Sequence, residues 1–144
     1  MNNQEKAKAV FNEGFSCSQA VLAAFCQELN LDKNTALKIA DSFGGGMGRL
    51  GLTCGAVTGA LLVIGLKYGR IAADDQKAKQ KTTQLVRNFI KRFEERNATA
   101  VCRELLGCDI STEEGFKYAK EHNLINTRCP DFVACAVGIL DEIL

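Results

Sequence analysis

Apolar residues recur at helical spacing along almost the whole chain of 144 residues. The chain has a single proline, Pro130, and no segment shows the strict alternation of apolar and polar residues that marks a half-buried strand. The expected helices cover about residues 3–13, 17–29, 32–41, 54–68, 74–96, 100–106, 112–121 and 130–144. We predict one all-α domain over residues 1–144, a bundle of about six to eight helices.

A glycine-rich segment interrupts this pattern between residues 44 and 51, where the chain reads Gly-Gly-Gly-Met-Gly-Arg-Leu-Gly. So many glycines leave the backbone unconstrained, which predicts a loop. The helix expected next, from Cys54 to about Tyr68, is largely uncharged. Its uncharged run is marginal in length for a membrane span and is diluted by glycines. We therefore expect a buried central helix and no insertion into a membrane.

Gly55 and Gly59 lie on one face of this central helix, four positions apart. Small residues at this spacing let a neighbouring element approach the helix closely. The neighbour could be another helix of the same chain, a second subunit in a homodimer, or a cofactor. The spacing alone leaves these three alternatives open.

Four of the seven cysteines stand where a helix is expected to begin: Cys17, Cys54, Cys102 and Cys129. Cys17 follows Ser16, which forms a capping-box pattern with Gln19, and Cys129 precedes Pro130, a residue favoured at the first helical position. The positive end of a helix dipole favours a thiolate over a thiol. Since thiolates bind metals and attack disulfides, these positions predict sulfur chemistry.

The other three cysteines have different settings. Cys26 and Cys135 lie within expected helices among alanine and valine, so we expect them to pack as small hydrophobic residues. Cys108 follows Gly107, and the sequence assigns it no role.

Charge and motifs argue against several classes of partner. With 18 basic and 17 acidic residues, the net charge of +1 gives no general attraction to nucleic acid. The basic residues between 77 and 96 lie on one expected helix with Asp74, Asp75, Glu94 and Glu95, and they lack interleaved aromatic residues. This indicates a solvated helix face, although docking to an acidic redox partner protein stays open. The start of the chain shows no signal-peptide pattern, so we expect a cytoplasmic protein.

The loop contains the spelling G-x-G-x-x-G at residues 46–51. A nucleotide-binding interpretation requires a strand before the motif, and a helix is expected there instead. Loop amides that point at the sulfurs of a cluster fit the same glycines better. The residues expected to contact such a cofactor are Gly44, Gly45, Gly46, Gly48, Gly55 and Gly59.

The segment Cys-Gly-Ala-Val-Thr-Gly at residues 54–59, with one cysteine upstream and two downstream, resembles the C_GCAxxG_C_C family. Residues 14–21, 43–48 and 102–106 support the resemblance, so it covers most of the chain. The four characteristic cysteines of the family fall on Cys17, Cys54, Cys102 and Cys129. The family name implies redox activity but supplies no defined reaction.

Three hypotheses for these four cysteines stay open. They could ligate an iron–sulfur cluster, most simply [2Fe–2S], that transfers single electrons to or from a redox partner protein. Two of them could instead act as redox thiols that interchange between dithiol and disulfide. The third hypothesis is a structural Cys₄ zinc site, although zinc sites usually contain cysteines two to four residues apart and this chain has no such pair among the four.

Overall fold

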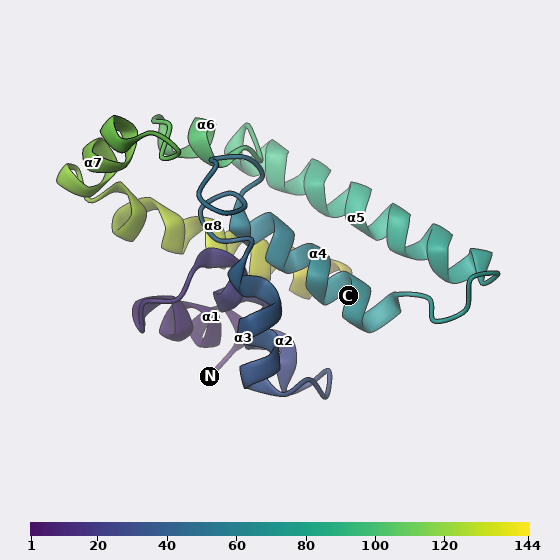
Figure 1. The fold of residues 1–144 in the computed structure, drawn as a ribbon. Coiled ribbons are helices and arrows are strands. Elements are labelled where there is room, and N and C mark those ends of the chain that lie inside the picture. Colours follow the sequence, from purple (N-terminus) through teal and green to yellow (C-terminus); the bar gives the residue numbers. More distant parts are fainter.

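Eight helices and no strand make up the computed structural model, which describes residues 1–144 (Figure 1). This confirms the predicted all-α class. The helices are α1 (Asn3–Asn12), α2 (Cys17–Cys26), α3 (Lys33–Asp41), α4 (Gly55–Tyr68), α5 (Gln76–Asn97), α6 (Cys102–Leu106), α7 (Glu113–Glu121) and α8 (Leu124–Ile143).

Side-chain caps fix the starts of several helices, as their sequences predict. The Ser16 amide donates to Gln19 Oε1 at 3.0 Å, as part of the expected capping box before α2. Asp32 accepts the amide of Thr35 at 3.0 Å before α3. Caps of the same kind precede α5, at Asp75, and α7, at Thr112. Each cap satisfies an amide that the first helical turn leaves without a partner.

The last helix does not begin where the sequence predicted. Instead of starting at Pro130, α8 begins at Leu124, just after Asn123, which has a positive φ of 51°. Leu124 and Ile125 pack against the hydrophobic core. Their burial extends the helix toward its N-terminus, so Pro130 lies inside the helix, where it removes one backbone hydrogen bond.

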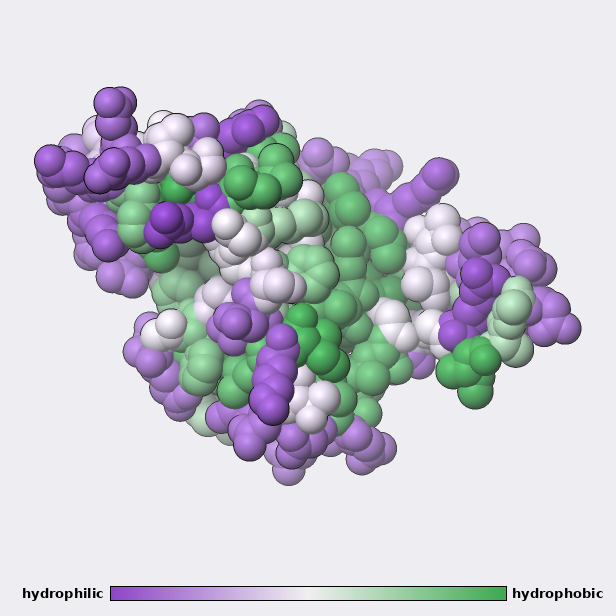
Figure 2. Space-filling view, in the orientation of Figure 1, coloured by the Kyte–Doolittle hydropathy of each residue, from purple (hydrophilic) through white to green (hydrophobic).

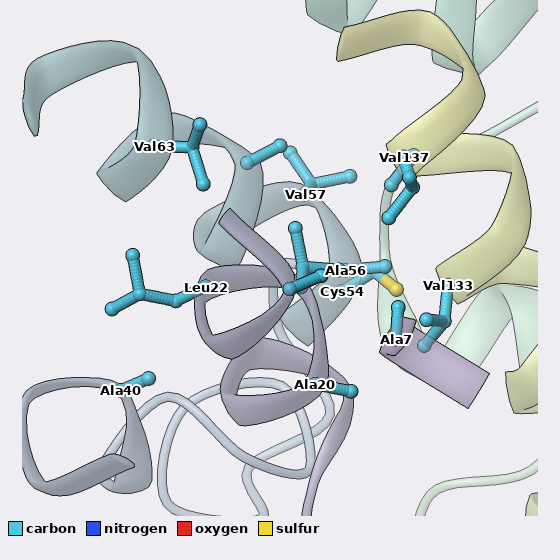
Figure 3. Close-up of a cluster of buried hydrophobic side chains, with 14 of the residues drawn as sticks. Ala7, Ala20, Leu22, Ala40, Cys54, Ala56, Val57, Val63, Val133 and Val137 are labelled. Carbon is cyan, nitrogen blue, oxygen red and sulfur yellow. The ribbon is translucent and has the colours of Figure 1, made fainter. Parts of the chain in front are cut away.

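Helix α4 occupies the middle of the fold, in contact with α2, α5 and α8 (Figure 1). Its residues Ala56, Val57, Ala60, Val63 and Ile64 are fully buried. Figure 3 shows Val63 of α4 on the side of Leu22 of α2, and Val57 of α4 on the side of Val137 of α8. The predicted buried central helix is confirmed, and no helix of the protein combines the length and hydrophobicity that a membrane crossing requires.

The neighbour that Gly55 and Gly59 admit is α2 of the same chain. A Cβ atom on Gly59 would lie 2.8 Å from the Ser18 carbonyl oxygen and 3.0 Å from the Val21 Cβ atom. A Cβ atom on Gly55 would lie 3.1 Å from the Ser18 amide nitrogen. The glycines therefore set the α2 backbone directly against α4, and a homodimer, which stays a prediction, would need another surface.

Candidate functional site

The glycine-rich loop between α3 and α4 curls back on itself. Six of its residues have positive φ values, and they are Gly45, Gly46, Met47, Gly48, Arg49 and Gly51. The Gly51 amide donates to the Gly45 carbonyl at 3.1 Å, and the Leu52 amide donates to the Gly46 carbonyl at 3.0 Å. Such a left-handed path is accessible mainly to glycine, which explains the composition of the segment.

The exit of this loop pairs with the segment that leads into α6. The Cys54 amide donates to the Ala100 carbonyl at 2.7 Å, and the Cys102 amide donates to the Leu52 carbonyl at 2.5 Å, around an antiparallel bridge between Thr53 and Val101. Because side chains alternate between faces in such a pairing, Cys54 and Cys102 lie on the same face. The sequence does not predict this pairing, since the paired segments are too short to give an alternating pattern.

One cavity of about 270 Å³ is bordered by all four of Cys17, Cys54, Cys102 and Cys129. The Cys54 side chain points from the start of α4 toward α8 (Figure 3). The cavity walls are mainly apolar and include Leu105, Leu106, Ile110, Phe116, Ile125 and Phe132. The fold thus collects sulfurs from distant parts of the chain in a pocket that contains few polar groups.

Three of these cysteines stand at helix starts, as predicted. Cys17 is the first residue of α2, Cys54 is the N-cap residue of α4, and Cys102 is the first residue of α6. Cys129 differs, because α8 begins at Leu124 and Cys129 lies beyond its first turn. The prediction that all four occupy helix starts is therefore wrong for Cys129.

Helix-start positions do not make Cys54 and Cys102 acidic, contrary to the sequence-based expectation. Burial raises the pKa of Cys54 from 9.0 to about 11, although hydrogen bonds from the Ala56 and Val57 amides lower it. Burial also raises the pKa of Cys102 to about 12, and negative charge on Cys54 and Cys129 adds to the shift. Burial removes water from the thiolate and disfavours this charged form, and its effect on the pKa is larger than that of the helix terminus.

Cys17 and Cys129 are neighbours at the cavity, and each thiol shifts the pKa of the other. Interaction with the Cys129 sulfur is the largest cause that raises the pKa of Cys17 well above 9.0, followed by burial and by the charges of the neighbouring cysteines. The same interaction lowers the pKa of Cys129, against the opposing effect of burial. The proton therefore stays on Cys17, and Cys129 is the member of the pair that is more easily ionised.

The glycines expected to contact a cofactor have different surroundings. Gly45, Gly46 and Gly55 border the cavity. A Cβ atom on Gly46 would lie 2.7 Å from the Cys102 Cβ atom, and one on Gly55 would lie 3.2 Å from the Cys17 Cβ atom. The amides of Gly45 and Gly46 donate no hydrogen bond to a backbone carbonyl.

The other three glycines of that set do not border the cavity. Gly44 packs against Ser16, Gly59 packs against Ser18, and Gly48 has open space where a side chain would be. A role in binding a cofactor stays a prediction for all six. No group of three or more His, Cys, Asp or Glu side chains is spaced to hold a metal ion in this structure.

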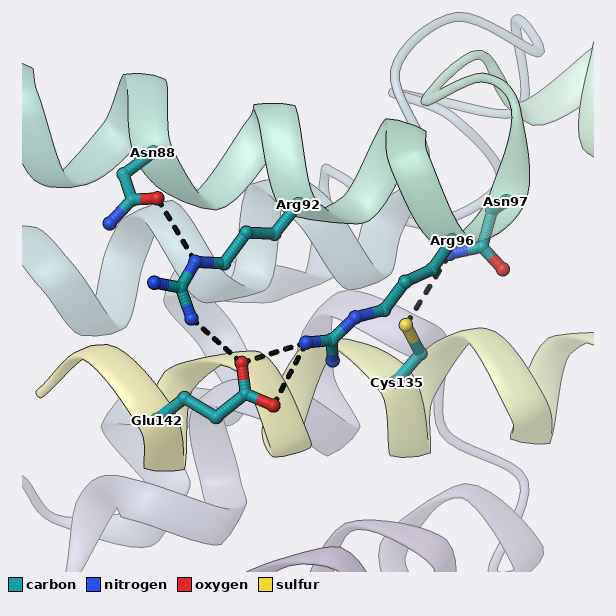
Figure 4. A network of polar contacts seen from close by, with 6 residues as sticks. All are labelled: Asn88, Arg92, Arg96, Asn97, Cys135 and Glu142. Carbon is teal, nitrogen blue, oxygen red and sulfur yellow. Dashed lines mark hydrogen bonds and ion pairs between the residues drawn. The ribbon is translucent and has the colours of Figure 1, made fainter.

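The remaining cysteines lie outside the cavity, and all seven are free thiols. Cys26 is buried and donates to the Ala23 carbonyl at 3.1 Å. Cys135 accepts a hydrogen bond of 3.4 Å from Asn97 Nδ2 (Figure 4). Cys108 is partly buried, and a negative charge on it would raise the pKa of Cys102.

Comparison with known proteins identifies the family of the chain. No curated protein and no solved structure matches the chain significantly. A family model described as "Putative redox-active protein (C_GCAxxG_C_C)" matches residues 15–143, which include all four cavity cysteines, and the chain therefore belongs to this redox-active family.

Proposed function

We propose that this protein is a thiol redox protein in which Cys17 and Cys129 interconvert between dithiol and disulfide. The observation that carries the proposal is the position of both thiols at one cavity, where each shifts the pKa of the other. Neighbouring thiols can form a disulfide by exchange with an oxidising disulfide. Redox activity is also what the family description states.

The two thiols have complementary roles in this reaction. The Cys129 thiolate attacks one sulfur of an oxidising disulfide and releases the other as a thiolate, which leaves a mixed disulfide on Cys129. Cys17 then loses its proton and attacks the Cys129 sulfur, which releases the second thiolate. The protein loses two electrons and two protons, and the oxidising disulfide becomes two thiols. The lowered pKa of Cys129 makes it the attacking residue.

Cys54 and Cys102 form the second pair at the cavity. They enter from the two paired segments, and negative charge on Cys129 raises both pKa values. Both thiols stay protonated at neutral pH, because burial disfavours their ionised forms. They are therefore less able than Cys129 to attack a disulfide.

An iron–sulfur cluster, most simply [2Fe–2S], is the second candidate. Two observations favour it: four thiols border one cavity, and the amides of Gly45 and Gly46 at its wall have no backbone partner. Four cysteines are the donor set of such clusters, and amides directed at sulfur tune them. Cys17, Cys54, Cys102 and Cys129 would hold the cluster, which supplies single-electron transfer when bound. A structural zinc site would need these thiols around one ion, and no three of them are spaced for that in this structure.

The partner that we propose is a redox protein, met in the cytoplasm. All seven thiols are free in the structure, and the cytoplasm keeps thiols reduced.

Anaerobic purification followed by iron, sulfide and zinc analysis tests the choice between these candidates. The metal-free protein is then equilibrated in mixtures of reduced and oxidised dithiothreitol, and its disulfides are mapped by mass spectrometry. We expect one two-electron transition with a Cys17–Cys129 cross-link. Stoichiometric iron and sulfide bound to all four cysteines would replace the proposal with the cluster. Failure of the pair to oxidise at any ratio would refute it.

A further inference from the structure

We infer that the cavity takes a small anionic reactant, a disulfide that carries a carboxylate, and that Arg49 binds this carboxylate. The inference rests on the proposed function, because it names the class of disulfide with which Cys129 reacts. A cavity of about 270 Å³ has the size of a small-molecule site rather than of a groove for a polypeptide.

Arg49 is the single charged residue at a cavity that is otherwise bordered by apolar side chains, glycines, cysteines and two neutral polar residues. The loop holds it firmly, since Arg49 has a φ of 61° and its amide donates to the Gly44 carbonyl at 3.1 Å. Its guanidinium carbon lies 4.1 Å from the centre of the Phe116 ring, which also borders the cavity. The cation is thus fixed at the cavity mouth by stacking on an aromatic wall.

The Arg49 guanidinium has no acidic partner. The ion pairs of the protein join Arg92 and Arg96 to Glu142 and Lys117 to Glu121. Stacking uses the flat face of a guanidinium and leaves its N–H groups free at the edge. Those groups can bind both oxygens of a carboxylate at once.

Lys120 adds a second positive charge at the same ring, with Nζ 4.3 Å from the centre of Phe116. Lys120 does not itself border the cavity, but positive charge on it and on Arg49 favours the approach of an anion to this side of the protein. These charges also offset the repulsion that a Cys129 thiolate would exert on an anionic disulfide. The apolar walls of the cavity suit the uncharged body of such a molecule. On the outer face shown in Figure 2, hydrophobic residues gather in the middle and hydrophilic residues at both ends.

The reaction is thiol–disulfide exchange between Cys129 and the bound disulfide, completed by Cys17. One carboxylate-bearing disulfide takes two electrons and two protons from Cys17 and Cys129 and leaves as two carboxylate-bearing thiols. The arginine forms no covalent bond. It binds and orients the reactant so that the disulfide faces Cys129.

Two aromatic disulfides test this inference on the reduced protein: 5,5′-dithiobis(2-nitrobenzoate), which carries two carboxylates, and 4,4′-dithiodipyridine, which is neutral. Oxidation is followed by the absorbance of the released thiol, and the Cys17–Cys129 disulfide is verified by mass spectrometry. We expect Arg49→Gln to slow the anionic reagent by about tenfold, as the loss of a charge-assisted contact implies, and to change the neutral rate by less than about twofold. Arg49→Lys, which keeps the charge but not the two-pronged contact, should fall between.

Arg87→Gln is the matched control, because Arg87 is exposed on α5, outside the cavity, and its loss changes the net charge equally. It should leave both rates unchanged. The neutral reagent shows that each variant keeps a working site. Equal changes in both rates for Arg49→Gln, or no change in either, would overturn this inference alone. If the neutral reagent also fails to oxidise the native pair, the proposed function falls, and this inference falls with it.

Discussion

The cavity and the seam between α5 and α8 both contain a cysteine at a helix contact, but the surroundings of the sulfur differ. At the seam, Cys135 accepts a hydrogen bond from the neutral Asn97 amide, beside Glu142 and its ion pairs to Arg92 and Arg96 (Figure 4). At the cavity, Cys17 meets the thiol of Cys129, with Cys54 and Cys102 close enough to influence its pKa. The Cys135 sulfur has a side-chain amide as its partner, whereas the Cys17 sulfur has the sulfur of Cys129.

The difference shows that the partner of a cysteine, rather than its position in a helix, decides what it can do. The seam is a set of satisfied polar contacts, since each arginine there already faces a carboxylate. The cavity instead holds titratable thiols among apolar walls, where burial raises the pKa values of Cys54 and Cys102. Redox chemistry is therefore expected at the cavity and not at the seam.

The largest expected effect comes from removing one thiol of the proposed pair. Cys17→Ser and Cys129→Ser should each abolish the reversible two-electron transition, because the remaining thiol of the pair has no partner with which to form the disulfide. Cys135→Ala should keep the transition and lose only packing. Redox titrations of the three variants measure this. A complete transition in either serine variant would remove the contrast between the cavity and the seam.

Cys54→Ser and Cys102→Ser sharpen the same comparison within the cavity. If the primary reaction is dithiol exchange, each variant should still form the Cys17–Cys129 disulfide on oxidation. If a cluster is bound, each should lose iron and sulfide after anaerobic purification, because the four ligands act as a set. Disulfide mapping and iron analysis of the same samples separate the two outcomes.

A smaller effect is expected from two glycines of α4 that differ in their surroundings. Gly59→Ala would place a Cβ atom 2.8 Å from the Ser18 carbonyl oxygen, whereas Gly65 has no atom within 4 Å of such a position. Overpacking should lower the free energy of unfolding by about 1–3 kcal/mol in Gly59→Ala. Gly65→Ala should raise it by about 0.5–1 kcal/mol, because alanine favours a helix more than glycine does.

Chemical denaturation of both glycine variants, with the wild type as reference, checks these signs. The displacement in Gly59→Ala should also reach Cys17, which precedes Ser18 in α2. Slower disulfide formation in Gly59→Ala than in Gly65→Ala is therefore expected. Equal unfolding free energies would mean that the contact between α2 and α4 adjusts without cost.

Local signals in the sequence predicted most of the helices. Caps such as Asp32 and Ser16 act within a few residues, so a single chain segment contains the whole pattern. The start of α8 was mispredicted for the opposite reason. The proline signal is local, but Leu124 and Ile125 extend the helix by packing against residues distant in the sequence.

The four cysteines of the site could be selected from the sequence, but their chemical states could not. The pairing of residues 51–54 with 100–103 and the contact of Cys17 with Cys129 join segments that no local pattern connects. Burial then reversed the expected effect of helix starts at Cys54 and Cys102. Arg49 was seen only as part of a glycine motif, since its place over Phe116 depends on the tertiary fold.

A moderate effect is expected on the pH dependence of the rate at which the Cys17–Cys129 pair reacts with a disulfide. The rate with a neutral disulfide should rise as Cys129 ionises, and its pKa lies below the ordinary value of 9.0 because Cys17 donates a hydrogen bond to it. Cys17→Ala removes the donor and should move the midpoint of the rate profile to higher pH. Cys17→Ser keeps an O–H donor and should move it less. Rate profiles between about pH 5 and 10 test this, and an unchanged midpoint in Cys17→Ala would show that the bond does not stabilise the thiolate.

The smallest expected effect lies at the seam. Arg92 and Arg96 contact Glu142 at 2.9 and 2.8 Å, but all three side chains are about 40% exposed, so water and salt screen the attraction. The arginines lower the pKa of Glu142 below its ordinary value of 4.5. Any stability from the ion pairs is therefore present above that pH, and it is lost as the pH falls and the carboxylate is protonated.

Glu142→Gln should therefore lower the melting temperature only slightly at neutral pH, and the difference from wild type should shrink in acid and in concentrated salt. A redox titration of this variant should match the wild type, because the ion pairs touch none of the cavity cysteines. A shifted titration would mean that the seam and the cavity are coupled through α8.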